Sequence, residues 1–317
     1  MKQNAKIWIA GKNGMAGSSI ARRLTERGFT NIIGPSSREL DLRRREETEA
    51  YVRRERPDCV ILAAAKVGGI QANIASPTDF LLENLEIQNH VISAALRCGV
   101  PRLLFLASSC IYPRLAPQPM REEYLLDGKL EPTNEGYALA KISGLKLCEY
   151  INRQYGLAYI SVMPCNLYGP GDNFDPVRSH VVPALIRKVH EAKMANAPYI
   201  TLWGTGEARR EVMYAGDLAD ACVFLLESGY SGPQFLNVGT GVDMTVRELA
   251  EAVMEVAGYR GEIRFDPSKP DGMPRKVLDV SRINKLGWRA KTSLKEGLKK
   301  TDSYYLENIA APGSAGN

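Results

Sequence analysis

The chain of 317 residues has no apolar stretch long enough to cross a bilayer. The residues after Met1 run straight into a short apolar segment and do not form the hydrophobic core of a secretory signal. These two absences argue against membrane and secreted classes. We therefore expect a cytoplasmic protein with no membrane partner.

Closely spaced pairs of metal-ligating residues are also missing. The chain has only three histidines and six cysteines, and no two cysteines have a short paired spacing. This pattern indicates neither a zinc site nor a disulfide framework, so we expect no bound metal and mostly buried, reduced thiols. The cysteines are Cys59, Cys98, Cys110, Cys148, Cys165 and Cys222.

Neither sign of charge dominates. Lysine and arginine number 41 against 36 aspartates and glutamates, a formal charge of +5, and the basic residues are spread among acidic neighbours, as in residues 43–47. Such a run is typical of a solvated helix face, and we expect no nucleic-acid partner. The small excess of cations still suits a phosphorylated substrate. A hydrophobic fraction of 44% is that of an ordinary folded protein.

Apolar runs alternate with helical patterns through the first half of the chain. Short apolar runs at 6–10, 31–33, 58–64 and 102–107 predict strands, and residues 18–27 and 81–98 predict helices. This alternation predicts an α/β fold with a Rossmann-type doubly wound parallel sheet. Further on, the patterns predict helices at 137–155, 183–195, 217–227 and 245–257 and strands at 159–163, 200–203 and 235–238.

The composition changes after the predicted strand at 159–163, where residues 169–176 are rich in Gly, Pro, Asp and Asn. We expect a dinucleotide-binding domain over residues 1–170, to which later segments return. Residues 171–310 would form mainly a smaller α/β substrate-binding lobe. The Pro, Gly and Ser content of residues 311–317 predicts a flexible tail.

Three glycines follow the first predicted strand at intervals of three residues. Gly11 would permit a tight turn, Gly14 would let the backbone approach a pyrophosphate, and Gly17 would let helix and strand pack closely. The helix that starts here would direct free N–H groups at the phosphates. A flexible loop is the alternative, but the strand–turn–helix context favours dinucleotide binding. The predicted turn comprises Gly11, Lys12, Asn13, Gly14, Met15, Ala16 and Gly17.

The end of the second predicted strand favours NADP over NAD. An acidic residue there usually binds the ribose 2′-hydroxyl of NAD, but residues 34–38 contain none. Glu39 comes one residue later and would oppose this preference. The groups available to a 2′-phosphate are Ser36, Ser37, Arg38 and Lys12, while Asp41 and Leu42 are expected near the adenine.

Ser108, Tyr137 and Lys141 form a pattern suited to carbonyl reduction. Tyr137 and Lys141 are four residues apart on a predicted helix and therefore share a face. The ammonium group would lower the pKa of the phenol, so that Tyr137 could exchange a proton near neutral pH. Ser108 follows an apolar strand and could donate to the same carbonyl oxygen. A Tyr-x-x-x-Lys pair alone arises often by chance, and the serine gives it weight.

With these residues in view, the sequence resembles the extended short-chain dehydrogenase/reductase family and, within it, the GDP-L-fucose synthases. The resemblance covers almost the whole chain and rests on residues 63–70, 108–113, 131–138, 163–170, 179–185 and 269–276. It implies NADPH-dependent epimerisation at C3 and C5 and reduction at C4 of a GDP-linked 4-keto-6-deoxy sugar. The alternatives are a related sugar-nucleotide 4-reductase or epimerase acting on another GDP-4-keto sugar, or a non-catalytic NADP-binding redox sensor.

The resemblance also implies roles for further residues. Cys110 and His180 would act as acid and base at C3 and C5. Without the resemblance, the residues by themselves favour a buried core thiol at Cys110 and a helix-capping or surface imidazole at His180. The cofactor would also contact Ala64, Ala65, Lys141, Pro164, Asn166, Leu167 and His180. The substrate would contact Lys188, Trp203, Arg210, Asp271 and Arg275.

Two positions depart from the family pattern. Asn13 and Ser37 stand where the family carries basic residues, which bears on how strongly NADP is held. The run 215–217 also differs from the family's usual Val-Asp-Asp. Apolar faces on the predicted helices at 81–98 and 137–155 could pair with a second copy, so we expect a homodimer.

Overall fold

The computed structural model describes residues 1–176, 178–232, 235–269 and 271–310. The predicted flexible tail at 311–317 lies outside the described residues. Among the described helices, none combines the length and the apolarity that a bilayer span requires.

The core of the protein is a six-stranded sheet in which every pairing is parallel. The strand order is β10-β5-β4-β3-β1-β2. The predicted doubly wound α/β fold is therefore confirmed. The strands are β1 (Ile7–Ala10), β2 (Ile32–Ile33), β3 (Cys59–Leu62), β4 (Arg102–Leu106), β5 (Ala158–Pro164) and β10 (Leu236–Val238).

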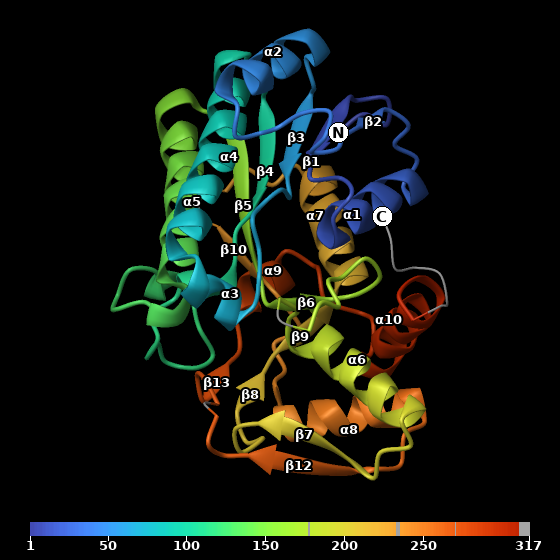
Figure 1. Cartoon of the computed structure of the whole chain (residues 1–317). Coiled ribbons are helices and arrows are strands. Elements are labelled where there is room, and N and C mark those ends of the chain that lie inside the picture. Colours follow the sequence, from blue (N-terminus) through green and yellow to red (C-terminus); the bar gives the residue numbers. More distant parts are fainter. Residues whose placement is uncertain (177, 233–234, 270, 311–317) are drawn as a thin grey trace.

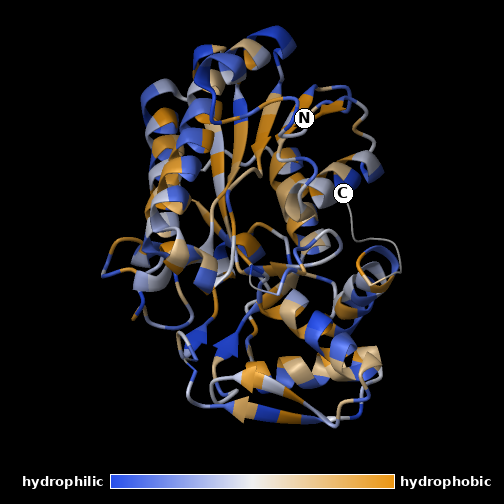
Figure 2. Ribbon diagram, viewed as in Figure 1, coloured by the Kyte–Doolittle hydropathy of each residue, from blue (hydrophilic) through white to orange (hydrophobic). Residues whose placement is uncertain are grey.

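Helices cover both faces of this sheet (Figure 1). On one face lie α2 (Arg45–Glu55), α4 (Pro77–Arg97) and α5 (Glu135–Tyr155), and on the other α1 (Met15–Glu26) packs against α7 (Ala215–Ser228). Because neither face meets water, β1 and β3 are buried along their whole length, and Figure 2 shows the strands of the sheet as mainly hydrophobic.

A second group of elements lies below the sheet in Figure 1 and has its own apolar cluster, built from residues between Tyr168 and Tyr305. Its helices are α6 (Val181–Met194), α8 (Val246–Ala257) and α10 (Leu294–Asn308). Its strands are β6 (Asn166–Tyr168), β7 (Tyr199–Trp203), β8 (Arg209–Arg210), β9 (Val212–Tyr214), β11 (Met244–Thr245), β12 (Glu262–Asp266) and β13 (Arg275–Lys276). The boundaries of the two domains stay a prediction.

The short elements complete the chain: α3 (Ile70–Ala75), α9 (Ser281–Lys285), η1 (Ser109–Ile111), η2 (Glu122–Tyr124) and η3 (Pro132–Asn134). The sequence patterns did not predict α3, β12 or α10. They also placed the start of α1 at residue 18, three residues too late. The helix begins directly after Gly14, whose backbone is extended. The helix therefore starts inside the glycine turn, where it can face a phosphate group.

Candidate active site

Two of the three glycines in the turn stand where a side chain would not fit. Gly11 has φ +87°, and a Cβ atom there would lie 2.6 Å from the backbone nitrogen of Ala64. A Cβ at Gly17 would lie 2.0 Å from the carbonyl oxygen of Gly11. A Cβ atom at Gly14 would have no neighbour closer than the carbonyl oxygen of Gly11, at 3.6 Å, so this position is open. Among the described residues no side chain caps α1, which leaves its first N–H groups available to a pyrophosphate.

Lys12 lies over the end of β2. A Cβ atom at Gly34 would be 2.6 Å from Cβ and 2.8 Å from Cδ of Lys12, so the lysine side chain crosses Gly34. Glu39, which could have favoured NAD, instead accepts hydrogen bonds from the backbone N–H of Ser36 at 2.7 Å and from its hydroxyl at 2.8 Å. Lys12 and the exposed Arg38 thus remain for a 2′-phosphate.

The predicted adenine-side residues lie close by. Asp41 accepts a hydrogen bond from Nη2 of Arg43 at 2.9 Å, and hydrogen bonds from Arg43 hold the pKa of Asp41 at about 2. The backbone oxygen of Leu42 is 3.0 Å from Nδ1 of His90 on α4. His90 therefore has a structural contact, and the carboxylate of Asp41 is balanced by an arginine.

Ser108, Tyr137 and Lys141 meet at the carboxyl end of β4. Ser108 is the N-cap of η1, and its hydroxyl accepts a hydrogen bond from the backbone N–H of Cys110 at 3.4 Å. Tyr137 and Lys141 lie on the first two turns of α5, and Nζ of Lys141 is 5.7 Å from the centre of the Tyr137 ring. The structure thus brings the three predicted residues together.

The lysine does not act on the tyrosine as the sequence predicted. Nζ of Lys141 donates to the carbonyl oxygen of Leu106 at 2.9 Å, and burial lowers the pKa of Lys141 to about 8. Burial raises the pKa of Tyr137 well above its ordinary value, the charge of Cys110 adds to the rise, and the Ser108 side chain opposes it. The predicted lowering of the Tyr137 pKa by Lys141 is therefore wrong, because desolvation of the phenol is the largest effect on this pKa.

Cys110 and His180 share one charged neighbour. Cys110 is 7% exposed, and burial raises its pKa, while the charges of Lys276 and Lys141 and the Ser108 side chain oppose this. His180 is the N-cap of α6 and is exposed to solvent. Desolvation by the surrounding protein atoms is the larger cause that lowers the pKa of His180, and the charge of Lys276 is the smaller one. The charge of Lys276 thus acts on the pKa of both the thiol and the imidazole.

The predicted nicotinamide-side residues follow neighbouring strands. Pro164 ends β5, and Asn166 and Leu167 belong to β6 directly after it. Ala64 and Ala65 follow β3. Because the carboxyl ends of parallel strands meet at one edge of the sheet, these residues lie on the same edge as Ser108 and the glycine turn.

The five predicted substrate residues all lie in the second group of elements, but four already have protein partners. Nζ of Lys188 donates to the carbonyl oxygen of Thr201 at 2.6 Å. The carboxylate of Asp271 accepts from the backbone N–H of Thr205 at 2.8 Å and from its hydroxyl at 2.9 Å. Trp203 is 51% exposed, with the ammonium group of Lys269 5.8 Å from its ring centre. Trp203 therefore offers the most accessible apolar surface of the five.

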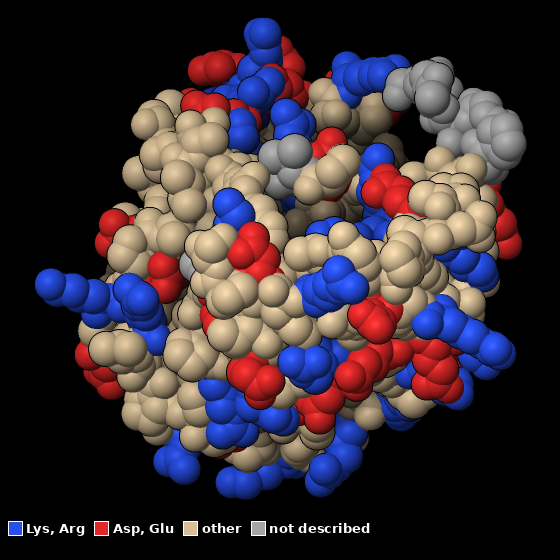
Figure 3. Space-filling view, turned by 60° about the horizontal axis from the view of Figure 1, so that its bottom comes forward, with Lys and Arg blue, Asp and Glu red and all other residues tan. Residues whose placement is uncertain are grey.

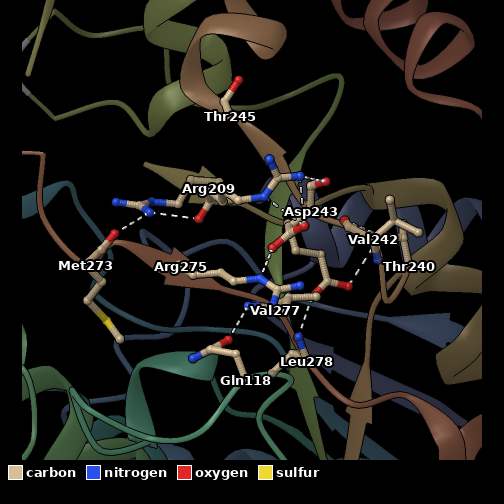
Figure 4. A network of polar contacts seen from close by, with 12 residues as sticks. Gln118, Arg209, Thr240, Val242, Asp243, Thr245, Met273, Arg275, Val277 and Leu278 are labelled. Carbon is tan, nitrogen blue, oxygen red and sulfur yellow. Dashed lines mark hydrogen bonds and ion pairs between the residues drawn. The ribbon is translucent and has the colours of Figure 1, made fainter. Parts of the chain in front are cut away.

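The two predicted arginines belong to a polar network around β8 and β13 (Figure 4). Arg210 donates to the carbonyl oxygens of Met273 at 2.6 Å and Asp271 at 2.9 Å, and burial lowers its pKa. Arg275 is paired with Asp243, which also binds Arg209 at 3.1 Å. The two guanidinium groups are thus fixed in place by the protein itself.

Lys276 and Glu211 were missed by the sequence reasoning. Lys276 lies within the resembling stretch 269–276, but nothing in its type or spacing gave it a role. Glu211 follows two arginines and had the pattern of a surface ion pair, yet it is 1% exposed.

Figure 3 shows a hollow on the face where the second group comes forward, with charged side chains of both signs spread around it.

Comparisons with known proteins agree with this arrangement. A curated relative from Oryza sativa subsp. japonica, a probable GDP-L-fucose synthase 1, is 53% identical over 97% of this chain and 94% of its own. The GDP-L-fucose synthase of Escherichia coli strain K12 is 50% identical over 96% and 97%. A GDP-mannoheptose C4 reductase from Campylobacter jejuni, solved with NADP bound, is 36% identical with a TM-score of 0.89 over 96% and 99%.

Residues 7–239 match the sequence model of the NAD dependent epimerase/dehydratase family. With a family match over most of the chain and relatives above 50% identity, the chain belongs to the NAD dependent epimerase/dehydratase family.

Proposed function

We propose that this protein epimerises C3 and C5 of GDP-4-keto-6-deoxy-D-mannose and reduces C4, with NADPH as reductant, to give GDP-L-fucose. The observation that carries the proposal is the meeting of Ser108, Tyr137 and Lys141 with Cys110 at the sheet edge beside the glycine turn. The first three residues suit carbonyl reduction, and the thiol adds proton transfer. Relatives with 50–53% identity over nearly the full chain carry the same activity in their names.

The residues present fit NADPH. The open position at Gly14 and the free N–H groups of α1 suit a pyrophosphate, and Lys12 and Arg38 suit a 2′-phosphate. When bound, NADPH supplies the hydride for C4. Pro164, Asn166 and Leu167 would line its nicotinamide end at the carboxyl edge of β5, with Ala64, Ala65, Lys141 and His180 nearby.

The 4-keto group acidifies the protons on C3 and C5, so each inversion needs a base on one face of the carbon and an acid on the other. Cys110 and His180 take these parts. The thiol is buried and the imidazole is exposed to solvent, so the two can exchange protons by different routes. Which of them acts at which carbon is open to experiment.

Tyr137 then donates its proton to the C4 oxygen as the ketone becomes an alcohol. Its raised pKa keeps it protonated at neutral pH, which suits a general acid. Ser108 donates a hydrogen bond to the same oxygen, and the ammonium of Lys141 stabilises the negative charge left on the phenol. The proton lost by Tyr137 is replaced from solvent.

The GDP moiety is proposed to lie along the second group of elements. Trp203 would pack on the base or a sugar ring, and Lys188, Arg210 and Arg275 would attract the diphosphate. Asp271 would accept hydrogen bonds from hydroxyl or guanine N–H groups, and its carboxylate is already oriented by Thr205.

A homodimer and a cytoplasmic location are proposed as well. The helices α4 and α5 lie side by side on the outside of the molecule (Figure 1), and Leu82 and Leu139 on them are 51% and 45% exposed. Pairing of this surface with a second copy would bury both side chains in a four-helix interface. The six free cysteines fit the reducing conditions of the cytoplasm.

A 4-reductase acting on another GDP-linked keto sugar is the second candidate, because the Campylobacter jejuni structures with TM-scores of 0.89 and 0.90 are described as GDP-heptose reductases. The deciding experiment measures NADPH consumption with a panel of GDP- and dTDP-linked 4-keto sugars and identifies the products. We expect the 6-deoxymannose substrate to give the fastest turnover and a fucose product. A product reduced without inversion would favour the second candidate, and no turnover would favour a redox sensor.

A further inference from the structure

Glu211, between β8 and β9, is a buried carboxylate whose hydrogen-bond donors come from two other segments. Its Oε2 accepts the backbone N–H of Leu278 at 2.7 Å, and its Oε1 accepts that of Gly241 at 2.8 Å and the hydroxyl of Thr240 at 3.4 Å. Within the described residues no lysine or arginine is paired with it. Its charge is therefore balanced by N–H and hydroxyl groups, and Figure 4 shows the network to which these contacts belong.

The carboxylate joins segments that are far apart in the sequence. The turn after β10 packs so closely on it that a Cβ atom at Gly239 would lie 2.1 Å from Oε1. Leu278 belongs to the stretch directly after β13, and its side chain is buried in the apolar core of the first sheet. Glu211 thus ties the second group of elements to the sheet edge where Cys110 lies.

Lys276, which ends β13, and Val277, which follows it, are each held by a hydrogen bond from or to another segment. The backbone N–H of Glu211 donates to the carbonyl oxygen of Lys276 at 3.1 Å, and the backbone N–H of Val277 donates to Oε1 of Gln118 at 2.9 Å. Arg275 turns toward Asp243. Since neighbouring residues on a strand point to opposite faces, Lys276 points the other way.

Lys276 is a half-buried cation without a direct partner: in the described parts of the chain its ammonium group makes no hydrogen bond or ion pair. The charged or titratable groups around it are Cys110, Arg210, Cys165, Glu131 and His180. Those around Cys110 are Lys276, Lys141 and Tyr137. Among these neighbours, Lys276 is the one charged group that acts on the pKa of both Cys110 and His180. The proposed mechanism gives Lys276 no role.

We propose that Glu211 is a positioning residue for proton transfer at C3 and C5, because it holds the strand that places the Lys276 ammonium beside Cys110 and His180. The inference rests on the proposed function. A nearby positive charge stabilises a thiolate and disfavours an imidazolium ion, so it shifts both groups toward their basic forms. Loss of this position makes both groups harder to deprotonate.

The test replaces Glu211 by glutamine, which keeps the size of the side chain but turns an N–H₂ group toward backbone N–H donors. Deuterium uptake from solvent into GDP-4-keto-6-deoxymannose is measured without NADPH from acid to alkaline pH. We expect uptake at neutral pH to fall about tenfold, the change in thiolate fraction for a pKa rise of about one unit. The midpoint of the pH profile should move to higher pH, as in Lys276→Met. The dissociation constant of NADPH, measured by fluorescence, should stay unchanged.

Glu122→Gln is the matched control. Glu122 is also buried, at 5% exposure, and accepts the backbone N–H of Asn237 at 3.0 Å, but among the described contacts it makes no hydrogen bond or ion pair with residues 276–278. We expect its pH profile to keep the wild-type midpoint even if its unfolding temperature falls. If Glu211→Gln fails to fold, Lys276→Met carries the test, because its ammonium makes no bond that folding would lose.

The inference is overturned if Glu211→Gln and Lys276→Met keep the wild-type rate and pH midpoint, or if Glu211→Gln shifts the midpoint no further than Glu122→Gln. A folded Glu211→Gln that loses NADPH binding also overturns it. Wild-type protein that exchanges no deuterium overturns the proposed function and this inference together. Wild-type exchange with unchanged variants overturns the inference alone.

Discussion

Gly17 packs directly on the carbonyl oxygen of Gly11, the residue at the other end of the same turn. A Cβ atom at Gly17 would lie 2.0 Å from that oxygen, closer than any real contact allows. This relation fixes how closely α1 approaches the end of β1. It explains in physical terms why the third glycine is required, whereas Gly14, with 3.6 Å to the nearest atom, is required only where a phosphate must come close.

Gly17→Ala should therefore destabilise the protein, and Gly14→Ala should not. Overpacking at Gly17 is expected to cost about 1–3 kcal/mol of unfolding free energy, because α1 must move away from the turn. Urea unfolding without cofactor measures both variants. Equal stabilities of the two variants would contradict the role given to the contact between Gly17 and Gly11.

Cofactor preference should depend on Lys12 and Arg38. Replacing either by alanine removes a cation proposed to bind the 2′-phosphate, and we expect the ratio of kcat/KM for NADPH to that for NADH to fall about tenfold. Arg44→Ala is the control, since Arg44 is exposed and lies 3.5 Å from Glu47. A ratio that stays constant in Lys12→Ala and Arg38→Ala would show that the 2′-phosphate binds elsewhere.

Tyr137→Phe should separate the two halves of the reaction. The variant lacks the proton donor for the C4 oxygen, so NADPH oxidation should fall by about two to four orders of magnitude. Deuterium exchange at C3 and C5 should continue, because Cys110 and His180 are intact. If the variant keeps both activities, the proposed role of Tyr137 is refuted. If exchange is lost together with reduction, the phenol also serves the inversions.

Association of two copies should depend on the exposed leucines of α4 and α5. Exchanging Leu82 and Leu139 for arginine places charges in the proposed four-helix interface, where they would be costly to desolvate. Sedimentation velocity should show a dimer for the wild type and a monomer for the double variant. Identical sedimentation of the two proteins would place any dimer contact elsewhere.

Much of the first sheet could be predicted because its strands are continuously apolar and its glycine turn has a fixed spacing. Ser108 and Tyr137 could be predicted for the same reason, since each has a regular position relative to a strand or helix. The helix α10 was missed because its buried residues, among them Thr301 and Asp302, do not form an apolar stripe. The one local signal is at its start, where Ser293 stands three residues before Glu296 and accepts a hydrogen bond from its backbone N–H.

Glu211 and Lys276 could not be predicted because their roles depend on contacts between distant segments. Glu211 meets Gly241 and Leu278, which lie 30 and 67 residues further along the chain. The two residues before it are arginines, which favour a surface ion pair, yet the fold turns the carboxylate inward. The pKa of Tyr137 was misjudged for a related reason: burial is a property of the folded protein and is not visible in a four-residue spacing.

The most direct test of the account follows deuterium in wild-type and Cys110→Ser protein. The substrate GDP-4-keto-6-deoxymannose is incubated in D₂O, first without and then with NADPH, and its label is located by NMR. The account predicts that the wild type places deuterium at C3 and at C5 before any reduction and then releases the fucose product, whereas Cys110→Ser exchanges at least about a hundredfold more slowly with NADPH binding intact. Rapid reduction at C4 with no deuterium at either carbon would contradict it.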